Sequence, residues 1–356
     1  MALIAVIGAG GKVGSYIVEQ LALEHSVIAI DISKKNLKQI GGYGSVIKHI
    51  CKDEGDIVNI LHSANPEVVV TCIPGSIAFG TIKKLIAEGF RIVDVSFYPQ
   101  DAFDVSELAE KSGSLYIPDA GIAPGFTNIL ASLWYDRNAI SFRAYVGGLP
   151  QNPKPPLYYS APFNPYDAFD EYLRPARIKQ CGYVRQVAPL QMVEWLTEFN
   201  DSPYPLGAVY TDGLRTLLKT IDYPEMAELT LRYKPHLDYV LDSFFTNKLT
   251  DPKTREEFIR YASVPDLDVT YFYAIAKYKN GAQKAFKFSH YQQGRHSSMS
   301  VLTGSVALGF VDWILNEDPD LIGIYPPEKL ASRSDPFIFG RLDKAGISNI
   351  WELKQT

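Results

Sequence analysis

The 356-residue sequence lacks the signals of several classes of protein. Its three cysteines, Cys51, Cys72 and Cys181, have neither the spacing of a zinc site nor that of a disulfide framework, so we expect no metal and a cytoplasmic protein. The net charge is -5 and no basic tract occurs, which argues against a nucleic-acid partner. No apolar run reaches the roughly 18 residues of a membrane span, so we expect no membrane partner.

The composition, 46% hydrophobic and 21% charged, is typical of a folded protein long enough for two domains. Apolar segments alternate with helical patterns through the first third of the chain. We expect strands at residues 2–7, 26–31, 46–50, 67–72, 91–96 and 115–119. This alternation predicts an α/β fold with a doubly wound parallel sheet, in which ligands bind beyond the carboxyl ends of the strands.

The first two strands enclose a glycine-rich turn and an amphipathic helix. Glycines without Cβ atoms let the backbone approach a pyrophosphate, and the first N–H groups of a helix face the anion. We therefore expect a dinucleotide here, with a structural turn as the alternative. The expected contacts are Gly8, Gly10, Gly11, Lys12, Val13 and Gly14. A G-x-G-x-x-G spacing would have glycine at Val13 instead of Gly14, so we expect a turn one residue longer.

The acid that ends the second strand, Asp31, lies 23 residues after Gly8. An acid at about this distance accepts hydrogen bonds from the adenosine ribose and repels the 2′-phosphate of NADP. The sequence therefore favours NAD. Lys34 and Lys35 follow closely and leave NADP open, unless they belong to a solvated helix start.

Three more residues follow the ends of predicted strands, at the rim where ligands gather. Cys72, Pro74 and Ser96 are expected to line the nicotinamide end of the dinucleotide. For Cys72, a small buried apolar residue is the alternative. The loop of residues 119–125 lies at the same rim.

The pattern changes near residue 150, where prolines become frequent. We expect a first domain at residues 1–128, an inserted α/β domain at 129–296, and a return to the first domain at 297–356. Strands are predicted at residues 143–146, 269–278 and 283–288, with a hairpin turn at Asn280-Gly281. Helices are predicted at residues 127–135, 165–172, 214–218, 225–231, 235–241 and 301–315.

Several stretches occur together in one order. They are residues 93–97 (VDVSF), 119–125 (DAGIAPG), 147–150 (GGLP), 171–176 (EYLRPA), 210–215 (YTDGLR), 298–299 (SM) with 303–304 (TG), and 323–328 (GIYPPE). This ordered set resembles the saccharopine reductase and lysine 6-dehydrogenase superfamily. The resemblance implies a Rossmann domain completed by the C-terminal segment, a second α/β domain that binds an amino acid, a homodimer, and hydride transfer at a carbon bearing nitrogen. The longer glycine turn and a Pro/Tyr-rich insertion at residues 152–164 depart from the family, and the insertion leaves the substrate open.

An amino-acid substrate brings charges that the protein must match. For its carboxylate we expect an arginine fork, first from Arg215, with Arg174 and Arg177 behind it. Salt bridges are the alternative role of these arginines. For a substrate nitrogen we expect Asp119, whose small-residue loop, including Gly121, suits close approach; an N-cap of the following helix is the alternative.

Further polar residues complete the expected site. Tyr210, Thr211 and Asp212 are expected to border one pocket, although Asp212 could instead stabilise the turn before Gly213. His290 and His296, in a predicted loop, are candidates for proton transfer because imidazole titrates near neutral pH. Solvated loop histidines are the alternative.

These observations predict an NAD(P)-dependent oxidoreductase acting on a CH–NH or CH–NH2 group of an amino acid, most similar to lysine 6-dehydrogenase. Glutamate-forming saccharopine reductase and a carboxynorspermidine-type reductase are the alternatives within the superfamily. A non-catalytic nucleotide-sensing protein, whose second domain would be a partner interface, is the alternative of another class.

Overall fold

The protein is described by a computed structural model for residues 1–350. The described residues form two compact units. Among these residues, unit 1 holds Met1–Ile129 and residues 300–350, and unit 2 holds Leu130–Met299. These divisions lie one and three residues from the predicted bounds at 128 and 296.

Unit 1 contains a seven-stranded parallel sheet in the order β15-β6-β5-β4-β1-β2-β3. Its strands are β1 (Leu3–Ile7), β2 (Ser26–Asp31), β3 (Val46–Ile50), β4 (Val68–Thr71), β5 (Ile92–Asp94), β6 (Leu115–Ile117) and β15 (Gly323–Ile324). The order reverses between β1 and β4, which is where open α/β sheets bind ligands. The last strand comes from the C-terminal part of the chain, so the predicted doubly wound sheet completed by that segment is confirmed.

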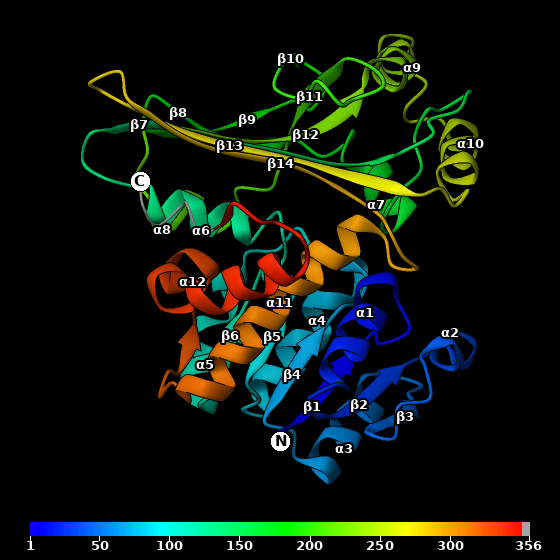
Figure 1. Ribbon diagram of the computed structural model, residues 1–356, viewed down its shortest axis with the longest axis vertical. Coiled ribbons are helices and arrows are strands. Elements are labelled where there is room, and N and C mark those ends of the chain that lie inside the picture. The colour runs from blue at the N-terminus through cyan, green and yellow to red at the C-terminus, as the bar shows by residue number, and fades with distance from the viewer. Residues whose placement is uncertain (351–356) are drawn as a thin grey trace. The chain divides into compact units, whose positions relative to one another are not determined.

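Helices cover this sheet (Figure 1). They are α1 (Lys12–Leu21), α2 (Lys34–Gln39), α3 (Glu54–Ala64), α4 (Gly75–Ala87), the 3-10 helix η1 (Ala102–Val105), α5 (Ser106–Ser112), α11 (Ser298–Glu317) and α12 (Pro327–Lys344). A further helix, α6 (Phe126–Leu133), contains the division between the two units. All four residues of β4 are buried, as its β-branched run predicts for a strand covered on both faces. In α4, Ile82, Leu85 and Ile86 pack into the same core as this sheet.

Helix α11 is the one candidate for a membrane span within residues 1–350, judged by its length and composition. The expectation that no apolar run reaches this length was therefore wrong. However, 72% of the tested window is buried, as is usual for the core helix of a folded domain. The helix is weak evidence for a membrane span.

Unit 2 contains a mixed sheet in the order β10-β11-β12-β7-β13-β14, with a hairpin of β8 and β9 attached to β12. Its strands are β7 (Ala139–Pro150), β8 (Ala176–Gln180), β9 (Tyr183–Val187), β10 (Glu194–Leu196), β11 (Leu206–Thr211), β12 (Glu225–Tyr233), β13 (Asp268–Tyr278) and β14 (Gln283–Tyr291). Its other helices are α7 (Pro165–Asp170), α8 (Leu217–Thr220), α9 (Lys234–Phe245) and α10 (Pro252–Ala262). The hairpin predicted at Asn280-Gly281 joins β13 to β14, which run side by side (Figure 1).

One predicted helix of unit 2 is wrong. Residues 225–231 form β12, which lies between β11 and β7. Ala, Leu, Met and Glu favour helices when taken singly, but polar and apolar residues alternate here from Glu228 to Arg232. Alternation places the two kinds on opposite faces of a strand. The helix predicted at residues 214–218 is also misplaced, because α8 begins only at Leu217.

Candidate functional site

The glycine-rich turn of unit 1 is built by very close backbone contacts. Gly8 has φ +78°, a conformation that favours glycine, and its N–H donates to the Ile30 carbonyl at 2.9 Å. A Cβ on Gly8 would lie 2.3 Å from the Cys72 carbonyl oxygen, and one on Gly14 would lie 2.2 Å from the Gly8 carbonyl oxygen. Side chains at either position would push the turn away from β4 or from α1.

Helix α1 begins at Lys12, directly after this turn. Its N-cap residue, Gly11, provides no side chain to cap the helix. Gly11 therefore offers no side-chain acceptor to the N–H groups of the first helical turn, and a helix start of this kind suits a phosphate. Within this turn, Gly14 packs so closely against the Gly8 carbonyl that its position needs a glycine, whereas the preceding Val13 carries a side chain. The residues present thus fit a dinucleotide.

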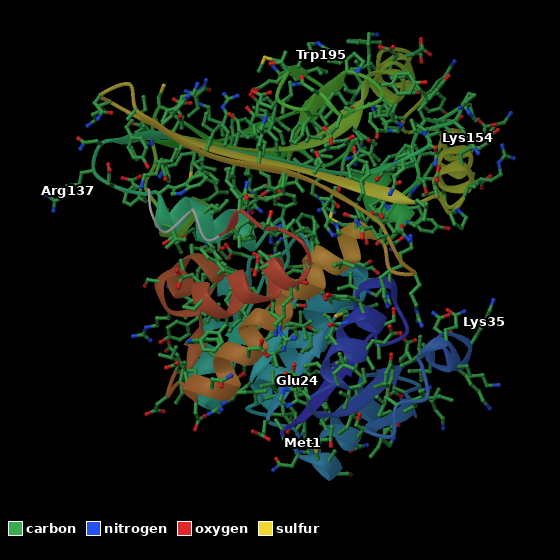
Figure 2. The ribbon with its side chains drawn as sticks, viewed as in Figure 1. Met1, Glu24, Lys35, Arg137, Lys154 and Trp195 are labelled. Carbon is green, nitrogen blue, oxygen red and sulfur yellow. The ribbon has the colours of Figure 1, made fainter. Side chains whose placement is uncertain are left out.

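Asp31 ends β2 and ties the turn to the chain that follows. Its Oδ2 accepts the Gly10 N–H at 2.8 Å, and its Oδ1 accepts the Ser33 N–H at 2.7 Å. Each carboxylate oxygen has further lone pairs with which it can accept a ribose hydroxyl. Lys34 and Lys35 are exposed at the start of α2, and Lys35 points away from the unit (Figure 2).

A buried polar cluster lies at the carboxyl ends of β4, β5 and β6. Oδ1 of Asp94 accepts the Thr71 hydroxyl at 2.6 Å and the Ser96 N–H at 2.9 Å, and its Oδ2 accepts the Tyr116 hydroxyl at 2.9 Å. Burial raises the pKa of Asp94 to about 6, against these hydrogen bonds. Sequence reasoning missed this cluster, although the strand end at Asp94 marked its place.

The predicted rim residues lie around this cluster. The Ser96 hydroxyl accepts the Ile73 N–H at 3.2 Å, and Pro74 is the N-cap residue of α4. Burial, and then the charge of Asp94, raise the pKa of the Cys72 thiol. The half-buried Cys72 therefore does not have the properties of a reactive thiolate. Its contact with the nicotinamide end stays a prediction.

The loop of residues 119–125 holds Asp119 in a conformation that aspartate rarely adopts. Asp119 has φ +55° and is 2% exposed. The next residue, Ala120, donates its N–H to the Asp94 carbonyl at 2.8 Å, and Gly121 donates to the Pro124 carbonyl at 3.1 Å. Helix α6 begins only at Phe126, so Asp119 is not its N-cap. Backbone strain of this kind often accompanies function.

In unit 2, one face of β12 carries the polar residues Glu228, Thr230 and Arg232. All three are buried or half-buried. The hydroxyl of Thr230 donates to the hydroxyl of Thr211, on the neighbouring strand β11, at 3.2 Å. Sequence reasoning missed Thr230 and Arg232 because it assigned their segment to a helix; the period-two alternation was the signal available.

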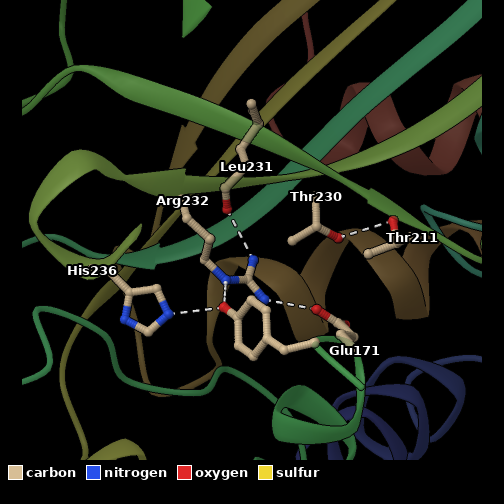
Figure 3. A network of polar contacts seen from close by, with 7 residues as sticks. Glu171, Thr211, Thr230, Leu231, Arg232 and His236 are labelled. Carbon is tan, nitrogen blue, oxygen red and sulfur yellow. Dashed lines mark hydrogen bonds and ion pairs between the residues drawn. The ribbon is translucent and has the colours of Figure 1, made fainter. Parts of the chain in front are cut away.

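Arg232 is the centre of a buried network (Figure 3). Its guanidinium donates to the Tyr172 hydroxyl at 2.7 Å, to the Leu231 carbonyl at 2.9 Å and to Oε2 of Glu171 at 2.7 Å. His236 Nδ1 lies 2.8 Å from the Leu157 carbonyl, which can only accept, so Nδ1 carries the hydrogen. Nε2 of His236 then accepts the Tyr172 hydroxyl at 2.8 Å.

This arrangement keeps His236 neutral. Burial, and then the charge of Arg232, lower its pKa to about 3. Burial also raises the pKa of the Glu171 carboxyl by more than Arg232 lowers it. The network joins β12, the end of α7, α9 and the inserted segment at residues 152–164.

The predicted carboxylate-binding region shows two different uses of arginine. Arg177 donates three hydrogen bonds to Asp212, at 2.7 to 2.9 Å, so these two residues hold each other. This favours the salt-bridge alternative for Arg177. Arg215 is 6% exposed and has φ +44°, before α8 begins. Arg174 is half-buried after α7.

The mixed sheet of unit 2 shows that three other predictions, for Tyr210, Thr211 and His290, were wrong about where the side chains lie. Tyr210 and Thr211 are adjacent on β11, so their side chains point to opposite faces and do not border one pocket. The Tyr210 hydroxyl donates instead to Oε1 of Glu194, at 3.3 Å. His290 lies on β14 rather than in a loop, and its Nδ1 is 2.8 Å from the Ser298 hydroxyl. His296 follows β14, before α11.

The predicted residues are thus divided between the units. Unit 1 brings together the glycine turn, Asp31, the rim residues and the loop of Asp119 and Gly121; unit 2 holds the arginines, Tyr210, Thr211, Asp212 and both histidines. Across residues 1–350, no group of three or more His, Cys, Asp or Glu residues is placed to hold a metal ion.

The family model of the saccharopine dehydrogenase C-terminal domain matches residues 121–347. The solved structure of apo saccharopine dehydrogenase (L-Glu forming) from Saccharomyces cerevisiae is 16% identical, with a TM-score of 0.77 over 97% of this chain and 98% of that chain. GenD2 from gentamicin A biosynthesis, in complex with NAD, is 10% identical, with a TM-score of 0.46 over 98% of this chain and 95% of that chain. The WlbA dehydrogenase from Thermus thermophilus, in complex with NAD and UDP-GlcNAcA, is 10% identical, with a TM-score of 0.44 over 96% and 95%.

The yeast structure shows that the fold is shared over 97% of the chain, whereas TM-scores below 0.5 do not define a topology. Because the family model spans more than half of the sequence, the chain belongs to the saccharopine dehydrogenase family.

Proposed function

We propose that this protein is an NAD(P)-dependent oxidoreductase that acts on a CH–NH or CH–NH2 group of an amino acid, with lysine 6-dehydrogenase activity as the first candidate. The glycine turn of unit 1 carries the proposal. Its N–H groups, the uncapped start of α1 and the anchored carboxylate of Asp31 together suit a dinucleotide. Membership of the saccharopine dehydrogenase family supports the same reaction class.

In this proposal Gly10, Lys12 and Val13 hold the pyrophosphate, and Asp31 holds the adenosine ribose. The bound cofactor supplies hydride transfer. NAD is the preferred form, because Asp31 would repel a 2′-phosphate and Lys35 points away from the unit (Figure 2).

The protein's own part is to match the charges of the substrate. Arg215 supplies a guanidinium for the carboxylate, and its restricted exposure strengthens such a pair. Asp119 supplies an anionic group for nitrogen, from a loop anchored on the Asp94 backbone. The hydroxyls of Thr211 and Thr230 supply hydrogen bonds that orient the amino acid.

Three other functions remain as candidates. The fold shared with the glutamate-forming yeast enzyme is compatible with a saccharopine reductase or a carboxynorspermidine-type reductase, which would accept a bulkier substrate. A nucleotide sensor would keep the glycine turn and bind NAD without turnover. The strained backbone of the buried Asp119 and Arg215 favours an enzyme over a sensor, because such conformations cluster at active sites.

The test is to follow absorbance at 340 nm with NAD or NADP while L-lysine, saccharopine or a diamine is offered, and to titrate each cofactor by calorimetry. We expect NAD to bind and L-lysine to be oxidised. Oxidation of saccharopine alone would select the reductase, and tight cofactor binding without turnover would select the sensor. Absence of heat from both nucleotides would overturn the proposal.

A further inference from the structure

The network around Arg232 leaves one charged group within reach of a ligand. The side chain of Arg232 is 2% exposed, and its guanidinium already donates to Tyr172, Leu231 and Glu171. The side chain of Glu171 is 23% exposed and accepts from Arg232 through Oε2. The accessible half of this ion pair is therefore the carboxylate.

The charge of that carboxylate is incompletely balanced. Burial raises the pKa of Glu171, and the guanidiniums of Arg232 and Arg174 lower it by less, while Asp167 adds to the rise. A further cation beside Glu171 would stabilise its charged form. A second anion would not.

The groups around the ion pair are rich in hydrogen-bond acceptors. The Tyr159 ring lies under the Arg232 guanidinium, 4.6 Å from its carbon to the ring centroid. Tyr159 is only 5% exposed, and its hydroxyl has no hydrogen-bond partner among residues 1–350. Thr230 lies on the same face of β12 as Arg232, about 7 Å along the strand. Its hydroxyl donates to Thr211 and keeps its lone pairs free to accept.

We propose that Glu171, held in place by Arg232, binds a cationic nitrogen of the substrate, with the hydroxyls of Tyr159 and Thr230 as further acceptors. An ammonium group has three N–H donors and no acceptor, so it matches this set. The proposal rests on the proposed function in that the substrate is an amino acid. Arg232 acts as a positioning residue, because it orients Glu171 and contacts no substrate.

The experiment is calorimetric titration of the full-length protein, without cofactor, with three probes: L-lysine, 1,5-diaminopentane and adipate. Adipate has two carboxylates and no nitrogen. We expect Glu171→Gln to weaken the binding of L-lysine and of the diamine at least tenfold. The affinity for adipate should stay within twofold of that of the wild type. The matched control is Asp170→Asn, which removes the preceding carboxylate from an exposed ion pair with Arg255 and should change no affinity.

A second variant keeps the test decisive if Glu171→Gln does not fold. Because the Tyr159 hydroxyl has no internal partner, Tyr159→Phe should keep the Tm of the wild type and weaken diamine binding at least threefold. Failure of the wild type to bind either amine, or amine binding unchanged in a folded Glu171→Gln protein, would overturn the site. So would an equal loss in Asp170→Asn.

Failure of the Glu171 site can be distinguished from failure of the proposed dehydrogenase function. If amines bind through Glu171 but neither nucleotide gives heat, the dehydrogenase proposal fails and this site stands. If the protein oxidises an amino acid with the same KM in Glu171→Gln, the dehydrogenase proposal stands and this site is overturned.

Discussion

At the scale of single residues, two of the polar side chains selected from the sequence have a strained backbone. Asp119 has φ +55° and Arg215 has φ +44°, and both are buried. Such conformations cost on the order of 1–3 kcal/mol and persist where the surroundings fix them. Arg177, in contrast, is fully engaged with Asp212. Among the arginines, the strain therefore favours Arg215 over Arg177 as a ligand-binding residue.

Asp31 gives a test of cofactor choice. Replacing Asp31 with serine removes the charge that repels a 2′-phosphate, so the ratio of NADP to NAD affinity should rise at least tenfold. Affinity for NAD should fall as well, because the N–H groups of Gly10 and Ser33 lose a carboxylate acceptor. Calorimetric titration with both cofactors measures the ratio. Asp53→Ser is the control, since it alters an exposed N-cap of α3 in the same unit; an unchanged ratio in Asp31→Ser would contradict a ribose role.

His236 makes unit 2 sensitive to acid. Its pKa is about 3 in the folded protein, below the ordinary value of about 6.5, so unfolding takes up a proton between these pH values. The contribution of His236 to the free energy of unfolding should therefore be at its full value above pH 6.5. It should fall by up to about 1.4 kcal/mol per pH unit as the pH drops towards 3. NMR titration of the His236 ring checks the cause: the ring signals should not shift between pH 8 and about pH 5. A midpoint near 6.5 in the folded protein would contradict the prediction.

At the scale of elements, the glycine turn could be predicted from the sequence because its glycines lie where neighbouring backbone comes too close for a side chain. Gly8 and Gly14 approach backbone oxygens that leave no room for a Cβ. Strand β12 was predicted wrongly because its residues have helical propensity, which outweighed the short alternation from Glu228 to Arg232, whereas pairing with β11 and β7 makes it a strand. The Asp94 cluster needs the register of three parallel strands, which no local pattern contains.

Two helical glycines distinguish propensity from packing. By propensity alone, glycine to alanine within a helix should stabilise by about 1 kcal/mol. Gly80→Ala in α4 should do so, because its Cβ would come no closer than 3.4 Å to the Glu54 side chain. Gly14→Ala in α1 should instead lower the Tm and abolish heat from NAD, because its Cβ would lie 2.2 Å from the Gly8 carbonyl oxygen. A Gly14→Ala protein that binds NAD like the wild type would place the dinucleotide elsewhere.

At the scale of the whole molecule, sequence and structure agree that the chain leaves the first sheet and returns to it. Strand β15 pairs with β6, more than 200 residues earlier in the chain. The return was predictable from the apolar segment that forms α11 and from the family resemblance. The length of β7 and the added β8–β9 hairpin were not, because their pairing depends on contacts that are distant in sequence.

The C-terminal segment should therefore contribute to the stability of the unit that contains the glycine turn. Arg341 of α12 donates to both carboxylate oxygens of Asp312 of α11, at 2.5 and 2.7 Å, and its side chain is 9% exposed. Arg341→Ala leaves Asp312 without this partner and should destabilise unit 1 by on the order of 3 kcal/mol. Arg333→Ala, at an exposed position of the same helix, should change stability by less than about 0.5 kcal/mol. Thermal unfolding in the presence and absence of NAD measures the effect. NAD should raise the Tm of both variants, and without NAD the Tm of Arg341→Ala should be the lower of the two. If Arg341→Ala unfolds like Arg333→Ala, the C-terminal helices do not support the dinucleotide-binding sheet.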